Sequence, residues 1–564
     1  MRQRRIRLPP LPPGRPNLVL TGFMGTGKTT VGRLVAQSLK MPFFDLDDEL
    51  EARTGRSISA LLGEDGEDRF RELERVVLEF ASRLSGAVIS TGGGAVLSAE
   101  AFARLGSNSV VVVLWASPQE VRSRLATAQP RPMLTGDLAI PVERLLDNRR
   151  FAYGQAGRGI ETTGRSPLEV AEEVSGHYQE EAGVGPAVFE MVRPMGTTKV
   201  VIGLGAAADL GTQIRLRLAS ARRAFVIADA GASAALAALT RSLEAAGLRV
   251  VVSVSPGGEV AKSLESVTSM WRFLLENEAD RQDVVVALGG GALLDSAGFA
   301  AATFARGLPL VNVPTTILAM GDASLGGKVA INLGGVKNPV GAFHHPELVV
   351  ADPLLIGDVA APLARSGLAE IVKAAVIGSP LCLRYLLRDE VDPSVPDQLN
   401  WLVEQSLRVK AAHVAADPTD RSERLALNLG HTFAHGLESA SDFRIPHGEA
   451  VGLGLLAAAR LGAQVGVSPL NLEEDIRSAL LQLGLPTSLP VAVDRSRVET
   501  AMRRDKKRRS GRAVFVVAGT DLGAVLLEEF DLAVALAALW ETAGGVLGKA
   551  GTTQPAALQQ WSRS

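Results

Sequence analysis

The sequence predicts an α/β protein with a phosphate-loop parallel sheet, then a Rossmann-like α/β domain, then a mainly α-helical domain. Its 564 residues correspond to three or four domain-sized units. Apolar strand-like runs alternate with helical stretches in two separate regions, which is typical of parallel sheets covered by helices. Beyond about Pro353 the strand signals thin out, and long Ala- and Leu-rich stretches predict helices.

Composition and charge narrow the classes of function. The 59 Lys and Arg against 61 Asp and Glu leave a net charge of −2, so no overall field would gather nucleic acid or an anionic membrane. Aromatic residues make up 4%, too few for the stacking platforms of single-stranded nucleic acid. The single cysteine, Cys382, cannot form an internal disulfide, which favours a reducing cytoplasm. Because no apolar run reaches the ~18 residues of a membrane span, we expect a cytoplasmic protein with small-molecule ligands and no nucleic-acid or membrane partner.

The first domain is placed at 17–180, with strand-like runs at 18–21, 43–46, 87–90 and 110–115. The preceding residues, 1–16, are basic and proline-rich, and we expect a solvated tail because they lack the apolar run of a signal peptide. Residues 181–197 are rich in Gly, Pro and small side chains and predict a linker. Such a linker favours modest contacts between the parts that it joins.

The second α/β domain is placed at 198–352, with strand-like runs at 199–204, 224–228, 250–254 and 284–288. The mainly helical domain follows at 353–547. Residues 548–564 are expected to form a second tail.

A phosphate-binding loop joins the first strand to the first helix. Residues 22–29, GFMGTGKT, fit G-x-x-x-x-G-K-[ST] in the strand-to-helix context that the motif requires. The glycines let backbone N–H groups converge on phosphate oxygens, Lys28 adds a positive charge, and the Thr29 hydroxyl reaches Mg²⁺. We expect ATP with Mg²⁺, contacted by Gly25, Thr26, Gly27, Lys28, Thr29 and Thr30.

Two carboxylates follow the second strand. Asp45 and Asp47 fall on one side of the strand end and are expected to point into one cleft. Beside a phosphoryl donor, such a pair can serve a hydroxyl acceptor and the metal shell. Further motifs then follow in order, namely FRELE at 70–74, STGGG at 90–94, RPML at 131–134, and Arg149 four residues before Tyr153.

With these motifs in this order and spacing, residues 17–177 resemble shikimate kinase. The resemblance implies that Asp47 orients or deprotonates the attacked hydroxyl and that Asp45 binds Mg²⁺ through water. It also implies a P-loop kinase sheet in which shikimate is held by Asp47, Arg71, Gly93 and Arg149. Two arginines can fix a carboxylate bidentately, which a kinase for a neutral polyol does not need.

The same resemblance places Arg131 in a mobile lid that contacts phosphate, and gives Glu74 the task of tethering Arg71. The alternative for this domain is a nucleotide-sensing regulatory module. Tight ATP binding without shikimate-dependent ADP release would favour that alternative.

The second α/β domain carries the marks of a dinucleotide site. The strand at 284–288 runs into three glycines, 289–291, which permit close backbone approach to a pyrophosphate. Asp229 lies just after another strand, where a carboxylate can accept from a ribose hydroxyl. The loop 256–262, PGGEVAK, adds polar groups.

Histidines gather in the helical domain, where four of the chain's 7 fall between 413 and 447. His431 and His435 lie at i and i+4 on one helix face, and His447 follows. Upstream, Glu370 and Lys373 lie one turn apart in a strongly apolar helix, so they need charged partners. One Glu with two His is a catalytic zinc arrangement, but the spacing does not tell which two of the three histidines bind.

Residues 196–545 resemble 3-dehydroquinate synthase, through PTT at 314–316, GDASLGGK at 321–328, KNPVGAF at 337–343 and the histidine segment. The resemblance implies that Glu370, His431 and His447 bind Zn²⁺ or Co²⁺. It implies NAD contacts from Asp229, Glu259, Lys262, Gly290, Gly291, Asp295, Thr315, Thr316, Lys337 and Asn338. It implies substrate contacts from Asp322, Lys328, Lys373, Lys410, Arg424, Asn428, His435, Lys506 or Lys507, and Arg306 of a neighbouring subunit in a homodimer formed through this half.

Together the resemblances imply a bifunctional enzyme that phosphorylates shikimate to shikimate 3-phosphate and converts 3-deoxy-arabino-heptulosonate 7-phosphate to 3-dehydroquinate and phosphate. For the second activity, a sister sugar-phosphate cyclase and an NAD-dependent polyol dehydrogenase remain as alternatives. Seven of the ten residues 503–512 are basic. We expect a partly solvated loop that touches substrate phosphate, with a nucleic-acid patch as the alternative.

Overall fold

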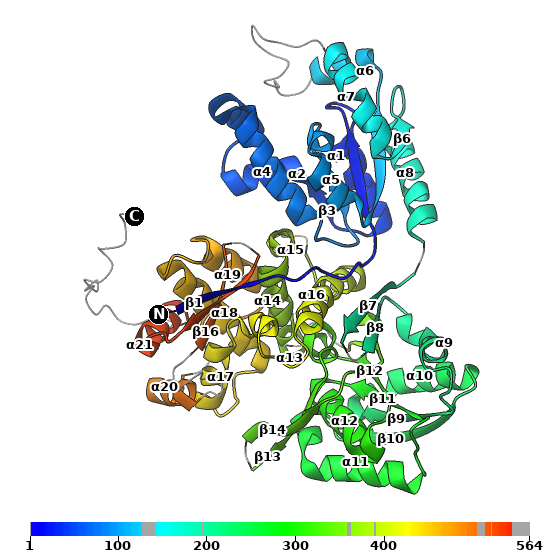
Figure 1. Ribbon diagram of the computed structural model, residues 1–564, viewed down its shortest axis with the longest axis vertical. Coiled ribbons are helices and arrows are strands. Elements are labelled where there is room, and N and C mark those ends of the chain that lie inside the picture. The colour runs from blue at the N-terminus through cyan, green and yellow to red at the C-terminus, as the bar shows by residue number, and fades with distance from the viewer. Residues whose placement is uncertain are drawn as a thin grey trace.

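The computed structural model describes residues 2–126, 142–183, 185–194, 196–334, 336–357, 362–388, 391–490, 492–504, 514–520 and 522–543 (Figure 1). Within these ranges the chain forms two α/β domains and a mainly helical domain, which confirms the predicted fold class. No helix in these ranges is both long and apolar enough to cross a membrane.

The first sheet is parallel throughout, with the strand order β3-β4-β2-β5-β6. Its central strand is buried along its whole length, because helices cover both faces of the sheet. The strands are β2 (Asn17–Gly22), β3 (Phe43–Asp45), β4 (Val88–Ser90), β5 (Ser109–Trp115) and β6 (Arg158–Glu161). The helices are α1 (Lys28–Leu39), α2 (Leu46–Thr54), α3 (Ile58–Ala60), α4 (Gly66–Ala81), α5 (Ala99–Gly106), α6 (Pro118–Ala126), α7 (Val142–Ala156) and α8 (Pro167–Ala182).

The second sheet has the order β10-β9-β11-β12-β15-β8-β7 and is parallel except for β7, which runs antiparallel to β8. Its strands are β7 (Ala187–Arg193), β8 (Gly196–Ile202), β9 (Arg223–Asp229), β10 (Arg249–Ser255), β11 (Val284–Gly289), β12 (Leu310–Pro314) and β15 (Leu348–Ala351). The helices are α9 (Leu210–Arg217), α10 (Ser233–Ala245), α11 (Leu264–Glu276) and α12 (Gly291–Thr303), and a hairpin is formed by β13 (Lys328–Leu333) and β14 (Val336–Phe343).

The helical domain is built around α14 and α18, which are apolar on nearly every side and are therefore buried in its core. Its helices are α13 (Pro362–Ser366), α14 (Leu368–Gly378), α15 (Pro380–Tyr385), α16 (Pro396–Ala416), α17 (His431–Ala440), α18 (His447–Gln464), α19 (Leu472–Gln482), α20 (Arg495–Arg504) and α21 (Leu532–Ala543). The strands β16 (Val514–Ala518) and β17 (Gly523–Glu528) complete it.

The expectation of a solvated tail at 1–16 is wrong. Residues Arg2–Arg7 form strand β1, which pairs antiparallel with β17 and covers its edge (Figure 1). Only Ile6 of this strand is buried. With one apolar side chain, the segment has no alternating pattern, so its backbone pairing with a strand some 520 residues away leaves no local signal.

The linker predicted at 181–197 is also partly wrong. Strand β7 occupies Ala187–Arg193 and forms an edge of the second sheet. Its side chains alternate, with Ala187, Phe189 and Met191 buried. The flanking glycines and prolines mask this short period-two pattern in the sequence.

The first domain packs closely on the helical domain, so the expectation of modest contacts between them is wrong. Trp401 Nε1 and Gln405 Nε2 both donate to the Ser85 carbonyl, at 2.7 and 3.0 Å. Arg408, which is buried, donates to the carbonyls of Pro12 and Arg83. One hydrophobic cluster runs through both domains.

We expect Ile6→Ala to destabilise the helical domain, because it removes the one buried side chain of β1. The loss should be about 2 kcal/mol in the free energy of unfolding. Gln3→Ala, at an exposed position of the same strand, is the control and should change it by less than about 0.5 kcal/mol. Denaturation followed by circular dichroism measures both. Equal midpoints for the two variants would show that β1 adds nothing.

Candidate active sites

The phosphate loop has the geometry that its motif predicts. It follows β2 and leads into α1, and Gly22, Gly25 and Gly27 adopt positive φ angles of 139°, 79° and 94°. Lys28 Nζ donates to the carbonyls of Gly22 and Phe23, each at 3.0 Å, so its ammonium is folded over the loop. The Thr26 hydroxyl donates to the Phe23 carbonyl at 2.8 Å, while Thr29 and Thr30 are exposed at the start of the helix.

The acidic pair lies beside this loop. Thr29 Oγ1 donates to Asp45 Oδ2 at 2.6 Å, and Asp45 Oδ1 accepts from the Asp47 backbone N–H at 3.1 Å. Asp45 therefore caps α2 while it faces the first turn of α1. A hydroxyl and a carboxylate at this separation form a donor set that suits Mg²⁺, a cation that prefers oxygen ligands.

Gly92, Gly93 and Gly94 bring Asp47 and the two arginines together. A Cβ at Gly92 would lie 2.7 Å from Asp47 Oδ1, and one at Gly94 would lie 2.2 Å from Arg71 Nη1. Only glycine leaves room for this approach. The Gly93 carbonyl accepts from Arg149 Nη1 at 2.9 Å and from the Tyr153 hydroxyl.

Arg71 is held by acids of its own helix. Its guanidinium donates to Glu74 Oε2 at 2.7 Å and to Glu67 Oε1 at 3.1 Å. The structure thus gathers Asp47, Arg71, Gly93 and Arg149 in one place.

Two observations complete this site. Arg131 lies outside the described residues. Arg124, which the sequence reasoning missed, donates to the Gly25 carbonyl at 3.2 Å and to the Thr162 carbonyl at 2.9 Å. The sequence around Arg124 contains no motif that would indicate a role. Its contact with the phosphate loop depends on the fold, which places α6 beside that loop.

A cleft of about 1650 Å³, lined by both the second α/β domain and the helical domain, includes all ten residues expected to contact NAD. At its floor β11 runs into α12 through Gly290, where a Cβ would meet Thr316 at 3.4 Å. Lys262 Nζ lies 2.5 Å from Asp295 Oδ2, and Asn332 donates to Glu259 at 2.6 Å. The cleft is large, and it adjoins the N-terminus of α12, where Gly290 has no Cβ that would keep a ligand away from the backbone. Both features fit a dinucleotide.

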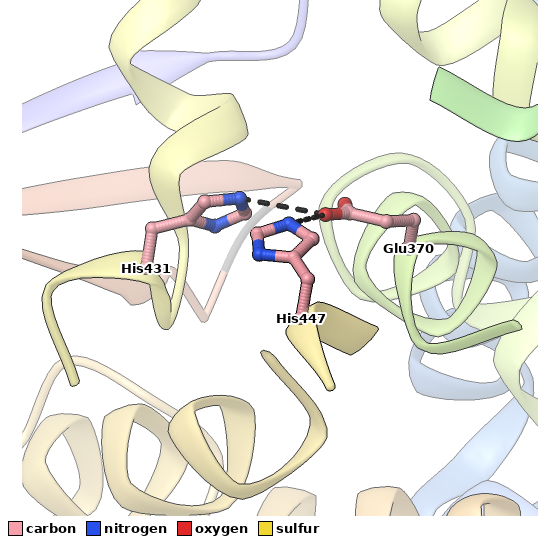
Figure 2. A group of neighbouring side chains, drawn as sticks. All are labelled: Glu370, His431 and His447. Atoms are coloured by element: carbon pink, nitrogen blue, oxygen red, sulfur yellow. Dashed lines mark hydrogen bonds and ion pairs between the residues drawn. The ribbon is translucent and has the colours of Figure 1, made fainter. Parts of the chain in front are cut away.

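Glu370, His431 and His447 form a candidate metal centre (Figure 2). One ligand atom from each lies within 4.8 Å of the others. Both Nε2 atoms face Glu370 Oε1, at 3.4 Å from His431 and 3.3 Å from His447. The remaining ring nitrogens are anchored, by the Leu429 carbonyl at 3.1 Å and by Glu438 at 3.3 Å. This donor set, with oriented imidazoles, fits Zn²⁺ or Co²⁺.

Glu438 is a second residue that the sequence reasoning missed. It contacts His447 Nδ1, and its other oxygen lies 3.5 Å from Lys337 Nζ. Burial alone would raise the pKa of Glu438, but the hydrogen bond from His447 and nearby cations lower it to about 2. The i, i+4, i+7 spacing of His431, His435 and Glu438 on one helix face was the available signal.

Charged groups surround the metal centre in a chain. Lys373 forms an ion pair with Glu370 and lies 3.9 Å from Asp322, which in turn lies 2.9 Å from Lys410 Nζ. Burial would raise the pKa of Glu370, yet Lys373 and His431 hold it well below its usual range. Burial lowers the pKa of Lys410 to about 8, and Asp322 only partly offsets this.

The other expected substrate contacts lie in different places. Arg424 is buried and donates to the Gly326 carbonyl at 2.8 Å, and Lys328 pairs with Asp420. Lys328 and His435 line the cleft, and Asn428 ends the turn just before α17. Arg306 is exposed at a positive φ of 67° after α12 and does not line the cleft. Lys506 and Lys507 lie outside the described residues.

The fold and sites define a phosphate-loop phosphotransferase joined to a Rossmann-like enzyme with a metal centre. Family models agree: shikimate kinase matches residues 24–178, 3-dehydroquinate synthase N-terminal matches 252–362, and 3-dehydroquinate synthase C-terminal matches 367–508. A 3-dehydroquinate synthase from Symbiobacterium thermophilum is 42% identical over 322 residues, which cover 55% of this chain and 88% of that protein.

Two solved structures resemble the second half. A 2-epi-5-epi-valiolone synthase from Streptomyces hygroscopicus with NAD⁺ and Zn²⁺ bound is 26% identical, at a TM-score of 0.52 over 61% of this chain and 96% of that one. A 2-deoxy-scyllo-inosose synthase complexed with carbaglucose-6-phosphate, NAD⁺ and Co²⁺ is 23% identical, at a TM-score of 0.55 over 63% and 100%, which shows a shared fold.

The chain belongs to the 3-dehydroquinate synthase family and carries a shikimate kinase domain on its N-terminal side. It is therefore a bifunctional enzyme of the shikimate pathway. Below, the kinase domain is the part up to α8, and the synthase half is the part from β7 onward.

The lowered pKa of Lys410 predicts a pH dependence. Its ammonium is present below about pH 8 and is lost above it. We expect kcat/KM for phosphate release to fall as the pH rises through about 8. Lys410→Arg should retain some activity and move this limb to higher pH, because a guanidinium keeps its charge. If kcat/KM falls at the same pH in the parent and in the variant, a group other than Lys410 causes the fall.

Proposed function

We propose that the kinase domain transfers the γ-phosphoryl group of ATP to a shikimate hydroxyl through the residues gathered at Gly92–Gly94. Backbone N–H groups of the phosphate loop and Lys28 bind the phosphates. Asp47 accepts the proton of the attacked hydroxyl, while Arg71 and Arg149 hold the carboxylate. The observation that carries this assignment is that both arginines and Asp47 meet the same three glycines beside the loop.

Mg²⁺ would be held by Thr29 and Asp45 and would neutralise developing charge on the phosphates. Arg131, from the segment after α6, is proposed to contact the transferred phosphate. Arg124 would stabilise the conformation of the phosphate loop by donating to the Gly25 carbonyl.

We propose that the synthase half converts 3-deoxy-arabino-heptulosonate 7-phosphate to 3-dehydroquinate and phosphate. NAD in the cleft and Zn²⁺ or Co²⁺ on Glu370, His431 and His447 would supply hydride acceptance and polarisation of a secondary alcohol. The observation that carries this proposal is that the ten expected NAD contacts line one cleft, and His447 of the metal centre lines it too.

The remaining side chains bind and orient the substrate. Lys373, Lys410 and Arg424 place positive charge beside the metal centre, as a doubly anionic substrate requires. Asp322 holds both lysines in place. Further contacts are proposed for Lys328, Asn428, His435, Lys506, and Arg306 of a neighbouring subunit.

We also propose a homodimer formed through the synthase half and a cytoplasmic location. Arg306 supports the dimer, because a substrate role for this exposed residue requires a second copy of the chain. The single, buried Cys382 suits a reducing compartment. The balanced charge supports small molecules as ligands, without nucleic acid or membrane.

Product identification tests both activities in the intact protein. The heptulosonate phosphate should yield 3-dehydroquinate and inorganic phosphate without net NADH, and shikimate with ATP should yield shikimate 3-phosphate. A different carbocycle would indicate a sister cyclase, and net NADH would indicate a polyol dehydrogenase. ATP binding without shikimate-dependent ADP release would indicate a regulatory module.

We expect Lys28→Ala to lower shikimate phosphorylation by on the order of 100-fold or more, because it removes the positive charge that binds the phosphates. Phosphate release by the synthase half should stay at the parental rate, since Lys28 bonds within the phosphate loop. Coupled assays of both activities on one preparation make the comparison. A parallel loss of both activities in a folded variant would contradict the assignment.

We expect His431→Ala to lose both the metal and the cyclisation, because one of the three donors is removed. Metal content per chain by inductively coupled plasma mass spectrometry should fall well below that of the parent. Shikimate phosphorylation serves as the control for folding and should persist. Full metal stoichiometry in this variant would show that the ligand set is wrong.

A further inference from the structure

The segment that carries the kinase's acidic pair is held from outside the kinase domain. It runs from β3 into α2 and contains Asp45 and Asp47. At its start, Arg388 Nη1 donates to the Phe43 carbonyl at 2.6 Å. Arg388 belongs to the synthase half, in the turn after α15. Figure 1 shows α15 and α16 directly beneath β3.

The other end of this segment is held through Glu49. Arg384 Nε donates to Glu49 Oε2 at 2.8 Å, and Arg388 Nη2 donates to Glu49 Oε1 at 3.3 Å. Glu49 is only 6% exposed. In the described part of the chain its two ion-pair partners both come from the synthase half. A carboxylate buried to this degree is costly without its cations.

Aromatic side chains close the same contact. Phe44 lies between the ends of the segment, with the Arg388 guanidinium 4.9 Å from its ring centroid. Its ring lies 6.1 Å from that of Tyr385 and 6.2 Å from that of Trp401. The synthase half therefore contacts a backbone carbonyl, an aromatic ring and a carboxylate of the kinase domain. All three belong to the few residues around Asp45 and Asp47.

We propose that Arg384 and Arg388 are positioning residues of the kinase, which hold β3 and α2 so that Asp47 faces the phosphate loop. This inference rests on the kinase function proposed above and on the role given there to Asp47. The arginines act through Glu49 and the Phe43 carbonyl rather than on the substrate.

The proposal predicts a selective defect. Asp47 belongs to the shikimate side of the site. Asp45 is bonded to Thr29 of α1, and the phosphate loop is carried by β2 and α1. Small displacements of a positioned reacting group cost large factors in rate. Arg388→Ala should lower kcat/KM for shikimate about tenfold, while KM for ATP stays within about twofold. Arg384→Ala should act in the same direction and less strongly, since Arg388 would still hold both ends.

Asp397→Asn is the matched control. It removes the Lys40–Asp397 ion pair, which crosses the same domain boundary at 3.3 Å but is exposed. It should leave kcat/KM for shikimate unchanged. Arg388→Lys should rescue only part of the loss, because an ammonium cannot bond Glu49 and the Phe43 carbonyl with the same fork. Thermal melts and phosphate release by the synthase half are measured on every variant.

The outcomes separate the possibilities. A parent enzyme that does not phosphorylate shikimate would overturn the proposed function itself. An active parent with unchanged shikimate kinetics in Arg388→Ala would overturn the inference alone. An equal loss of kcat/KM for shikimate and for ATP in Arg388→Ala would show a general effect on folding and would overturn the inference. The same loss of kcat/KM in Asp397→Asn would overturn it too.

Discussion

A carboxylate buried in an apolar helix is the constraint on which the rest of the structure depends. Glu370 is 1% exposed within α14, where most neighbouring side chains are aliphatic. Such a charge is tolerated only with partners. They come from one turn further along the same helix, as Lys373, and from α17 and α18, as His431 and His447. This one group therefore joins three helices, and it forms the candidate metal centre with His431 and His447.

The same helix connects that centre to the kinase. Ser379 follows the end of α14 and caps α15 by accepting from the Cys382 N–H, so the two helices are joined without a flexible loop. Helix α15 then presents Arg384 and Tyr385 to β3 and α2, and the turn that follows it presents Arg388. Buried kinase residues such as Leu50 belong to the same hydrophobic cluster as the aliphatic side chains of α14. The two catalytic domains are thus built on one core rather than tethered by a linker.

Sequence reasoning reached what is encoded locally. The phosphate loop, the eight strand-like runs and the i, i+4 pair His431 and His435 are all patterns of a few neighbouring residues. Part of what it missed depends on pairing across long separations. Strand β1 has one buried side chain, and its partner β17 lies at the other end of the chain. In the sequence nothing distinguishes Glu49 from other glutamates in helices. Its role as an ion-pair partner depends on the fold, which places Arg384 and Arg388 beside it.

The buried contact between the domains has no place in substrate transfer. The synthase releases 3-dehydroquinate, whereas the kinase takes up shikimate, so neither site makes what the other consumes and a channel between them would carry nothing. The contact between the domains instead contains a network of hydrogen bonds. Trp401 and Gln405 donate to the Ser85 carbonyl, and Arg408 donates to the carbonyls of Pro12 and Arg83. Left unpaired while buried, such groups would each cost about 1–3 kcal/mol, so these hydrogen bonds are what allow the two parts of the intact chain to pack this closely. The contact between the domains is therefore structural, and it includes the hydrogen bonds from Arg384 and Arg388 to the segment that carries Asp45 and Asp47.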